Sequence, residues 1–401
     1  MKVTENLVTK DHSKLVSAIL ADQVNRHQQL LLTWECPDVE TAGMVEQFIR
    51  HFDTPVACAE KRVEFSFPLL SLKELIARVK EWWDNDDELI ASLEQVYRRH
   101  QIIWRAGRFT FDLTEQPVIY GILNVTPDSF YDGGKFQSHS AIVNQIAKMV
   151  AAGANVIEVG GQTTKPGGFK EVDPEEEIAR IMPAIQLLRE NYPQVAIAVD
   201  TYKLPVMAAA IEAGVDIIND VQAFNSKQKL ILMAKANVGM VTMHSSRTHD
   251  YDNLTVAMQK FFEHNLGTIA AADIDLERVI LDQGIGYAKV ADGYQDYAMM
   301  RNIDQLNYLH RPIMVAISRK GFGQKLFNLA KEDRLGVTLI AETAMYLRGG
   351  RVLRVHDVEE TSQLVKMIDT IENSYWFRST NCGGPNGSTS CSPVSRKALE
   401  S

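Results

Sequence analysis

The chain has 401 residues, 45% of them hydrophobic, so it can bury a large core and is too long to form only one small domain. Its net charge of −9 argues against a nucleic-acid partner, although a local basic pocket is compatible with it. No apolar run approaches the roughly 20 residues of a membrane span, and no signal-like segment follows residues 1–6, so we expect a soluble, cytoplasmic protein that enters no membrane.

Residues 1–100 are predicted to form a small α+β domain. Apolar residues alternate through 63–67 as in a half-buried strand, and they recur at helical spacing through 39–52. Ser71 and Glu74 stand three residues apart before another helical stripe, which predicts a capping box. We find no catalytic arrangement here, so packing or oligomerisation is the simpler interpretation of this domain.

Residues 101–376 are predicted to form a (β/α)8 TIM barrel, entered through a hairpin at residues 104–113. Short, almost wholly apolar runs are typical of parallel strands buried on both faces, and each run here is followed by a segment of helical periodicity. Eight such repeats match a closed barrel. Residues 377–401 lack apolar periodicity and are predicted to form a disordered tail. The predicted strands are residues 118–124, 155–160, 195–200, 215–219, 238–243, 278–282, 313–318 and 351–355.

Polar residues stand at the carboxyl ends of these predicted strands. In a barrel these ends converge on one face, where a polar side chain serves a ligand rather than the core. A single Asn or Asp at such an end is often only a helix cap, but a polar group after every strand predicts one shared site. The groups are Asn124, Thr164 in the loop after residue 160, Asp200, Asn219, His244, Asp282, Ser318 with Lys320, and Arg354 with His356.

Two kinds of chemistry are present in this set. The oxygens of Asp200, Asn219 and Asp282 match the donor-rich edge of a flat heterocycle such as a 2-amino-4-oxopyrimidine ring, and Lys320 adds a donor for a ring nitrogen or carbonyl. A second group supplies donors for phosphate oxygens. The site is therefore predicted to bind a ring-bearing diphosphate ester. The residues of the second group are Lys165, Arg354 and His356.

Seven segments of the chain, in order, resemble the motifs of the dihydropteroate synthase family. The resemblance runs from about Trp104 to the helix after Asp357, and it implies the same barrel fold that the repeats predict. A match to one glycine-rich turn would carry little weight, whereas seven motifs in order are specific. The segments are GILNVTPDSFYDGG, GANVIEVGGQTTKPG, AVDTYK, DIINDV, VILDQGIGYAK, ISRKGF and RVHDV.

The resemblance implies condensation of 6-hydroxymethyl-7,8-dihydropterin diphosphate with 4-aminobenzoate, with release of 7,8-dihydropteroate and diphosphate in folate biosynthesis. It also implies Mg²⁺ as a cofactor that neutralises the diphosphate and, by analogy, a homodimer. The implied roles are Asp200, Asn219, Asp282 and Lys320 for the pterin, with Asp200 and Lys320 catalytic; Asn124, Thr164, Lys165, Arg354 and His356 for the diphosphate; Ser318, Thr164 and Pro166 for the aminobenzoate; and Asn124 for the metal.

The chain departs from the family pattern at three motifs, one of which is the seventh-strand segment Ser318-Arg319-Lys320-Gly321. The usual E-S-T-R-P-G is Gln162-Thr163-Thr164-Lys165-Pro166-Gly167 here, and Lys165 lacks the bidentate fork of arginine. The usual D-P-G is Asp282-Gln283-Gly284, which is expected to loosen the turn beneath the pterin. Two alternatives therefore remain beside the synthase: a pterin-binding methyltransferase on a related barrel, and a non-catalytic pterin-binding paralogue.

Several residues near the predicted site have weaker assignments. The long, glycine-bearing loops 124–135 and 161–171 are expected to move without ligand and to exclude water when closed. His244 is interpreted equally as a pocket residue or as packing beneath the pocket. Because side chains alternate along a strand, Arg319 is predicted to point away from the site toward a salt bridge, and Asp220 is predicted to face away from Asn219.

Overall fold

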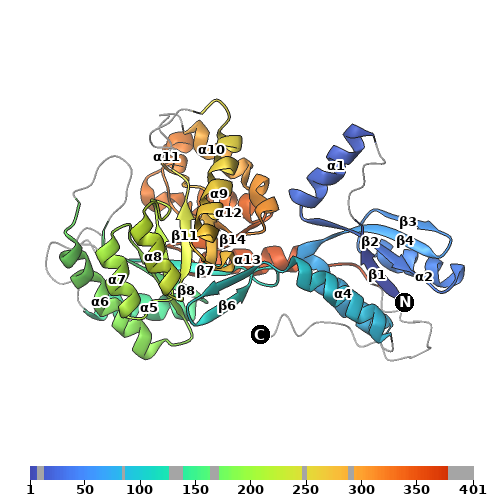
Figure 1. Ribbon diagram of the computed structural model, residues 1–401, viewed down its shortest axis with the longest axis horizontal. Helices are drawn as coiled ribbons and strands as arrows, with labels where there is room; N and C mark the ends of the chain where they lie inside the picture. The colour runs from blue at the N-terminus through green and yellow to red at the C-terminus, as the bar shows by residue number, and fades with distance from the viewer. Residues whose placement is uncertain are drawn as a thin grey trace. The chain divides into compact units, whose positions relative to one another are not determined.

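The computed structural model describes residues 1–6, 13–83, 86–125, 139–162, 171–245, 251–287 and 293–377 (Figure 1). The chain divides into two compact units. The first joins Met1–Gln101 to the described residues from Met367 onward, and the second is Ile102–Lys366. Within the described residues no helix is both long and apolar enough to cross a membrane.

The first unit is the small α+β domain that the sequence predicts. Its antiparallel sheet has the strand order β1-β2-β4-β3, and Val63, Phe65 and Phe67 of β4 point into the core, which confirms the predicted alternation. The predicted capping box is wrong, because the Ser71 side chain accepts no hydrogen bond from the helix that it precedes. The elements are β1 (Lys2–Glu5), α1 (Lys14–Asn25), β2 (Gln29–Glu35), α2 (Val39–Arg50), β3 (Val56–Ala59), β4 (Arg62–Pro68), α3 (Leu72–Trp82) and α4 (Asp87–His100).

The residues that follow the last helix belong to the core of this first unit. Phe377 stacks on His51 with ring centroids 4.8 Å apart, and Tyr375 meets Phe52 edge to face at 4.9 Å. The sequence interpretation assigned residues up to 376 to the barrel, because aromatic side chains without periodicity do not indicate which core they join. Residues 378–401, where a disordered tail is predicted, lie outside the described residues.

The second unit is a closed barrel of parallel strands, which confirms the predicted fold class. Within the described residues eight strands close it in the order β10-β11-β12-β13-β14-β7-β8-β9. Each predicted strand is present, with its ends moved by at most three residues. The strands are β7 (Val118–Asn124), β8 (Val156–Gly160), β9 (Ala196–Asp200), β10 (Ile217–Asp220), β11 (Gly239–Met243), β12 (Val279–Asp282), β13 (Ile313–Val315) and β14 (Gly350–Val355).

Helices follow every barrel strand, and a hairpin precedes the first. The hairpin strands β5 (Ile103–Ala106) and β6 (Phe109–Asp112) confirm the predicted hairpin, and Trp104 donates its indole hydrogen to the Arg278 carbonyl oxygen just before β12. The hairpin thereby covers the amino end of the barrel. The helices are α5 (His139–Ala151), α6 (Pro174–Asn191), α7 (Leu204–Glu212), α8 (Lys227–Lys235), α9 (Leu254–Ala271), α10 (Tyr294–Arg301), α11 (Phe322–Phe327), α12 (Leu335–Tyr346) and α13 (Val358–Glu372).

The barrel interior is apolar at its amino end and polar at its carboxyl end. Side chains two residues apart share one face of a strand, so a strand that buries Ala196 and Ala198 in the barrel core must also direct Asp200 inward. The same spacing leads from Ile217 to Asn219 and from Val352 to Arg354. The interior therefore consists of an apolar layer beneath a layer of polar side chains.

Candidate active site

The polar layer of the barrel is centred on the Arg354 guanidinium. Its Nε lies 2.8 Å from Glu158 Oε1, its Nη2 also donates to that oxygen, and its Nη2 lies 3.0 Å from Asp200 Oδ2. Burial alone would lower the pKa of Arg354, but the two carboxylates outweigh it and raise that pKa. Arg354 is therefore a fixed cation that joins β8, β9 and β14.

Glu158 is the residue of this layer that sequence reasoning missed. It is 1% exposed, and its Oε2 accepts hydrogen bonds of 2.9 Å from the Tyr120 hydroxyl and from Asn219 Nδ2. The available signal was a carboxylate at an interior position of an otherwise apolar strand, in phase with Val156. Because an unpaired buried carboxylate is costly, such a position indicates that several partners converge on it.

Two acceptor atoms of this layer remain open. Asp200 Oδ1 and Asn219 Oδ1 are buried and have no hydrogen-bond partner among the described residues, while the other polar atom of each side chain is bonded to Arg354 or Glu158. Buried polar atoms without partners are rare in folded proteins and mark places where a ligand supplies the missing bond. Two adjacent acceptors suit a ligand edge with two donors.

Asp200 has an unusual protonation equilibrium for an aspartate. Burial and then the negative charge of Glu158 raise its pKa to about 7, although Arg354 acts in the opposite direction. The carboxyl group therefore changes charge near neutral pH, a property that is common at catalytic positions.

Asp282 and Lys320 lie on the neighbouring side of the layer. The Gly284 amide donates to Asp282 Oδ1 at 2.8 Å, and burial raises the Asp282 pKa against the pull of Lys320. Lys320 donates to the Ile285 carbonyl oxygen, and burial lowers its pKa to about 8, although Asp282 opposes that shift. The two side chains are thus coupled by charge at the ends of β12 and β13.

The turn after β12 is anchored through Gln283. Gln283 is 1% exposed and donates to the Met299 carbonyl oxygen at 2.9 Å, which ties the turn to α10. Gly284 has a φ of +72°, and a Cβ there would collide with the His244 carbonyl oxygen, so only glycine fits. The amide of Gln283 thus supplies an anchor in place of proline, and the expectation that the substitution loosens this turn stays a prediction.

Ser318 and His356 form one unit at the ends of β13 and β14. The backbone amide of His356 donates to Ser318 Oγ at 3.1 Å, and the same oxygen lies 3.0 Å from His356 Nδ1. Burial and then the Arg354 charge lower the His356 pKa to about 4, so the ring is neutral at pH 7. His356 can therefore serve an anion as a hydrogen-bond donor but not as a cation.

The remaining predicted site residues are unevenly placed. Asn124 ends β7 beside Gly160, where a Cβ would lie 3.3 Å from Asn124 Oδ1, so the glycine leaves room for that amide. Thr164, Lys165 and Pro166 lie outside the described residues, as do most of the two loops expected to move. Among the described residues, no group of three or more His, Cys, Asp or Glu is arranged to hold a metal ion.

Three neighbours of the predicted site are engaged elsewhere in the structure. Arg319 forms two 2.8 Å bonds to Asp357, and Asp220 forms a 2.8 Å ion pair with Lys229, which confirms that both point away from the site. His244 is 2% exposed and packs against Phe261 with ring centroids 5.1 Å apart, and burial lowers its pKa to about 4.

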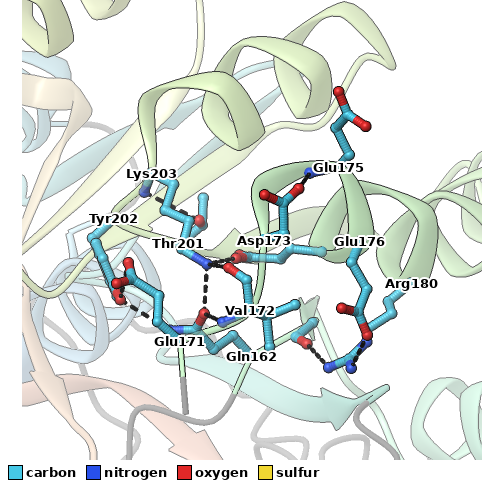
Figure 2. A network of polar contacts seen from close by, with 12 residues as sticks. Gln162, Glu171, Val172, Asp173, Glu175, Glu176, Arg180, Thr201, Tyr202 and Lys203 are labelled. Atoms are coloured by element: carbon cyan, nitrogen blue, oxygen red, sulfur yellow. Dashed lines mark hydrogen bonds and ion pairs between the residues drawn. The ribbon is translucent and has the colours of Figure 1, made fainter. Parts of the chain in front are cut away.

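A second polar network lies at the base of the loop that follows β8 (Figure 2). The buried Lys203 ammonium lies 2.8 Å from Glu177 Oε2 and 2.5 Å from Gln162 Oε1, and it also donates to the Val172 carbonyl oxygen. Gln162 in turn accepts from the Val172 amide at 2.9 Å and donates to the Tyr202 hydroxyl at 3.0 Å. Lys203 therefore joins Gln162 to Val172, which stand on either side of the segment 163–170 in the sequence.

A parallel barrel whose buried charges meet at the carboxyl ends of its strands is the architecture of a barrel enzyme. The family described as pterin binding enzyme matches residues 120–356, and the chain belongs to that family.

The chain is also similar to dihydropteroate synthases. It is 35% identical over 269 residues to the one from Clostridium beijerinckii, covering 67% of this chain and 98% of that relative. The structure from Xanthomonas albilineans with 4-aminobenzoic acid has a TM-score of 0.63 at 30% identity, covering 68% of this chain and 98% of that one. The structure from Burkholderia cenocepacia complexed with 7,8-dihydropteroate has a TM-score of 0.60 at 27% identity, covering 67% and 96%.

Proposed function

We propose that this protein is a dihydropteroate synthase, a transferase of folate biosynthesis. It condenses 6-hydroxymethyl-7,8-dihydropterin diphosphate with 4-aminobenzoate and releases diphosphate. The observation that carries the proposal is the pair of open, buried acceptors, Asp200 Oδ1 and Asn219 Oδ1, beside Arg354 in a chain of this family. The names and bound molecules of its relatives, 4-aminobenzoic acid and 7,8-dihydropteroate, support it.

In the proposed reaction the pterin ring lies on the acceptors of the polar layer. Asp200 and Asn219 accept from its amino and ring N–H groups, and Asp282 adds a further carboxylate. Lys320 donates to a ring nitrogen or carbonyl. As the carbon–oxygen bond to the diphosphate breaks, positive charge develops on the ring system, and the ionised Asp200 stabilises it. Asp200 and Lys320 are therefore the proposed catalytic residues.

The departing diphosphate is assigned to the cationic side of the site. Arg354 and the neutral imidazole of His356 are proposed to donate to its oxygens, together with Thr164, Lys165 and the Asn124 amide. The Asn124 oxygen is a hard ligand of the kind that Mg²⁺ prefers, and diphosphate oxygens commonly complete such a site. When bound, Mg²⁺ supplies charge neutralisation of the leaving group.

The amine substrate is assigned to the rim formed by Ser318 and the loop after β8, through Thr164 and Pro166. An aromatic amine is already nucleophilic, so this part of the site has to orient its nitrogen toward the carbon that loses the diphosphate. As the carbon–nitrogen bond forms, the nitrogen gives up one proton to the departing diphosphate or to water. We further propose that the enzyme works in the cytoplasm as a homodimer. Large apolar side chains exposed on and beside α11 and α12 support a protein partner there, and they are Leu326, Phe327, Ile340 and Leu347.

Diphosphate release with and without 4-aminobenzoate tests the proposed reaction. We expect release from the pterin diphosphate only when the amine is present, together with formation of dihydropteroate. A pterin-binding methyltransferase would release no diphosphate, and a non-catalytic pterin-binding protein would bind the pterin diphosphate without turnover. Either of these results would overturn the proposal. A titration with the pterin diphosphate in the presence and absence of Mg²⁺ tests the metal assignment separately.

Gln162→Leu is expected to weaken both the barrel and the use of the amine. It removes the hydrogen bonds that Gln162 makes to Lys203, Tyr202 and Val172, at a cost of about 1.5–3 kcal/mol in the free energy of unfolding. Lys203 then loses its bond to Gln162, which precedes residues 163–170. KM for 4-aminobenzoate should therefore rise several-fold, and KM for the pterin diphosphate should rise with it, since Thr164 and Lys165 of the same segment are assigned to the diphosphate. Denaturant unfolding and steady-state kinetics measure the two effects.

The matched control for this change is Gln222→Leu. Gln222 also accepts from a buried lysine, Lys229, at 3.2 Å, but it lies in the turn after β10. The control should lose stability without a change in KM for the amine. If both variants raise that KM equally, the network around Lys203 has no special connection with amine binding.

A further inference from the structure

We propose that Glu158 is a positioning residue that sets the specificity of the site, because it fixes Asn219 with its carbonyl oxygen toward the substrate ring. The inference rests on the proposed function and deepens it. It predicts a preference for pteridines with a donor at position 2, such as a 2-amino-4-oxo ring, over 2,4-dioxo pteridines, which carry an acceptor there.

Glu158 is saturated by hydrogen-bond donors. Oε1 accepts from both Nε and Nη2 of Arg354, and Oε2 accepts from the Tyr120 hydroxyl and Asn219 Nδ2. An ionised carboxylate offers about four lone-pair sites and can only accept. All four are occupied, and the side chain is 1% exposed, so Glu158 is neither a substrate ligand nor open to water.

Glu158 fixes the orientation of the Asn219 amide. An asparagine presents a donor on one side and an acceptor on the other. Since Glu158 cannot donate while ionised, Asn219 must turn its NH₂ group toward Glu158. Its Oδ1 is then left as the open acceptor, which is the atom found without a partner. Without Glu158, Asn219 could present either its NH₂ group or its oxygen to the ligand. Glu158 fixes the oxygen in that position.

Glu158 also leaves an open acceptor on Asp200, through Arg354. Arg354 is held by Glu158 and bridges to Asp200 Oδ2 at 3.0 Å, which leaves Asp200 Oδ1 as a second open acceptor. One interior glutamate therefore arranges two adjacent acceptors through two different partners. An oxygen at position 2 of a ring would meet these acceptors with no shared hydrogen, whereas an amino group satisfies them.

The test is Glu158→Gln, which keeps the size of the side chain but adds a donor. A glutamine can donate to Asn219 Oδ1, so it allows the amide to turn over and present NH₂ to the ligand. We expect the affinity for 6-hydroxymethylpterin, measured by fluorescence titration, to fall about tenfold, and the preference over the 2,4-dioxo analogue to shrink by a similar factor. The double variant Glu158→Gln with Asn219→Asp should regain the preference, since the introduced carboxylate accepts from the introduced amide and again presents an acceptor to the ring.

A second readout separates this role from plain packing. Glu158 raises the Asp200 pKa in the ligand-free protein, so in Glu158→Gln the acid limb of the kcat/KM profile should move to lower pH. The other charges that face Asp200 are unchanged in the variant: Arg354 lowers its pKa, and Glu177 and Asp220 raise it. The matched control is Glu342→Gln. Glu342 is equally buried, bonds Thr361 and lies on α12, and its substitution should change neither ring preference nor the acid limb.

Two results would overturn the inference. One is a Glu158→Gln protein with unchanged ring preference and an unmoved acid limb, whatever its stability. The other needs no variant: wild-type protein that binds the 2-amino and 2,4-dioxo rings equally well. In both results the ring preference is read by pteridine binding without turnover, so this readout stands apart from the synthase assignment. A protein that releases diphosphate normally yet shows either result would keep the proposed function and lose the role of Glu158.

Discussion

Asp200→Asn is expected to lower kcat by about 10²–10³-fold, the usual effect of removing one electrostatic contact to a transition state. The substitution keeps the shape of the side chain and can keep an acceptor at Oδ1. It removes the negative charge that the proposed mechanism places beside a developing cation. Steady-state turnover at saturating concentrations of both substrates measures the loss, and calorimetric titration shows whether binding of the pterin diphosphate survives.

The pH dependence gives an independent check on Asp200. Its pKa is raised to about 7, so the carboxylate is ionised above that pH and protonated below it. If the ionised form is the active one, wild-type kcat/KM for the pterin diphosphate should fall as the pH is lowered through about 7, because kcat/KM reports the pKa of the ligand-free enzyme. The residual activity of Asp200→Asn should lack this acid limb, because nothing titrates at position 200. Near-normal turnover in the variant, or an acid limb that persists, would remove Asp200 from the mechanism.

The rim of the barrel could be predicted from the sequence because its signals are local. Asp200, Asn219 and Asp282 each follow a short apolar run, and the period of two along a strand fixes which face they take. The same rule placed Arg319 and Asp220 outside the site. These predictions need no knowledge of which strands are neighbours, since every strand end of a parallel barrel meets the same face.

The partners of these residues could not be predicted, because they depend on distances across the fold. Arg354 and Glu158 are 196 positions apart, and only the closed barrel brings β14 and β8 to either side of β7. From sequence, Arg354 has the character of a free phosphate ligand. In the structure it already holds two carboxylates, so an incoming diphosphate has to compete with them or share the guanidinium.

The partners of Lys203, which follows β9, could not be predicted from the sequence either. It follows Asp200 by three residues and appears from sequence to be an ordinary charge at the start of a helix. Its burial depends on Glu177 of α6 and on Gln162 after β8. The family motif carries glutamate where this chain has Gln162, so here Glu177 is the one carboxylate within ion-pair distance of Lys203 among the described residues.

Arg354→Met should destabilise the barrel by about 3–5 kcal/mol at neutral pH, which is typical when one partner of a buried ion pair is removed. Glu158 and Asp200 would then lie in the interior without their cation. Arg354 lowers the pKa of Asp200, so without it the folded-state pKa of Asp200 would rise further above that of the unfolded chain, and the native state would bind more protons than the unfolded state between the two values. The loss in the free energy of unfolding relative to the wild type should therefore be smaller at pH 5 than at pH 7.5. Denaturant unfolding at the two pH values measures it.

The double variant Arg354→Met with Glu158→Gln distinguishes lost charge balance from lost packing. Removing the charge of Glu158 as well leaves neutral side chains at both positions 158 and 354. The double variant should therefore be more stable at neutral pH than Arg354→Met alone, and its stability should depend less on pH. Equal losses in the two variants, with no pH dependence in either, would mean that Arg354 supports the barrel through its alkyl chain. In that case its guanidinium is free for the diphosphate, and the competition inferred above between substrate and interior carboxylates does not exist.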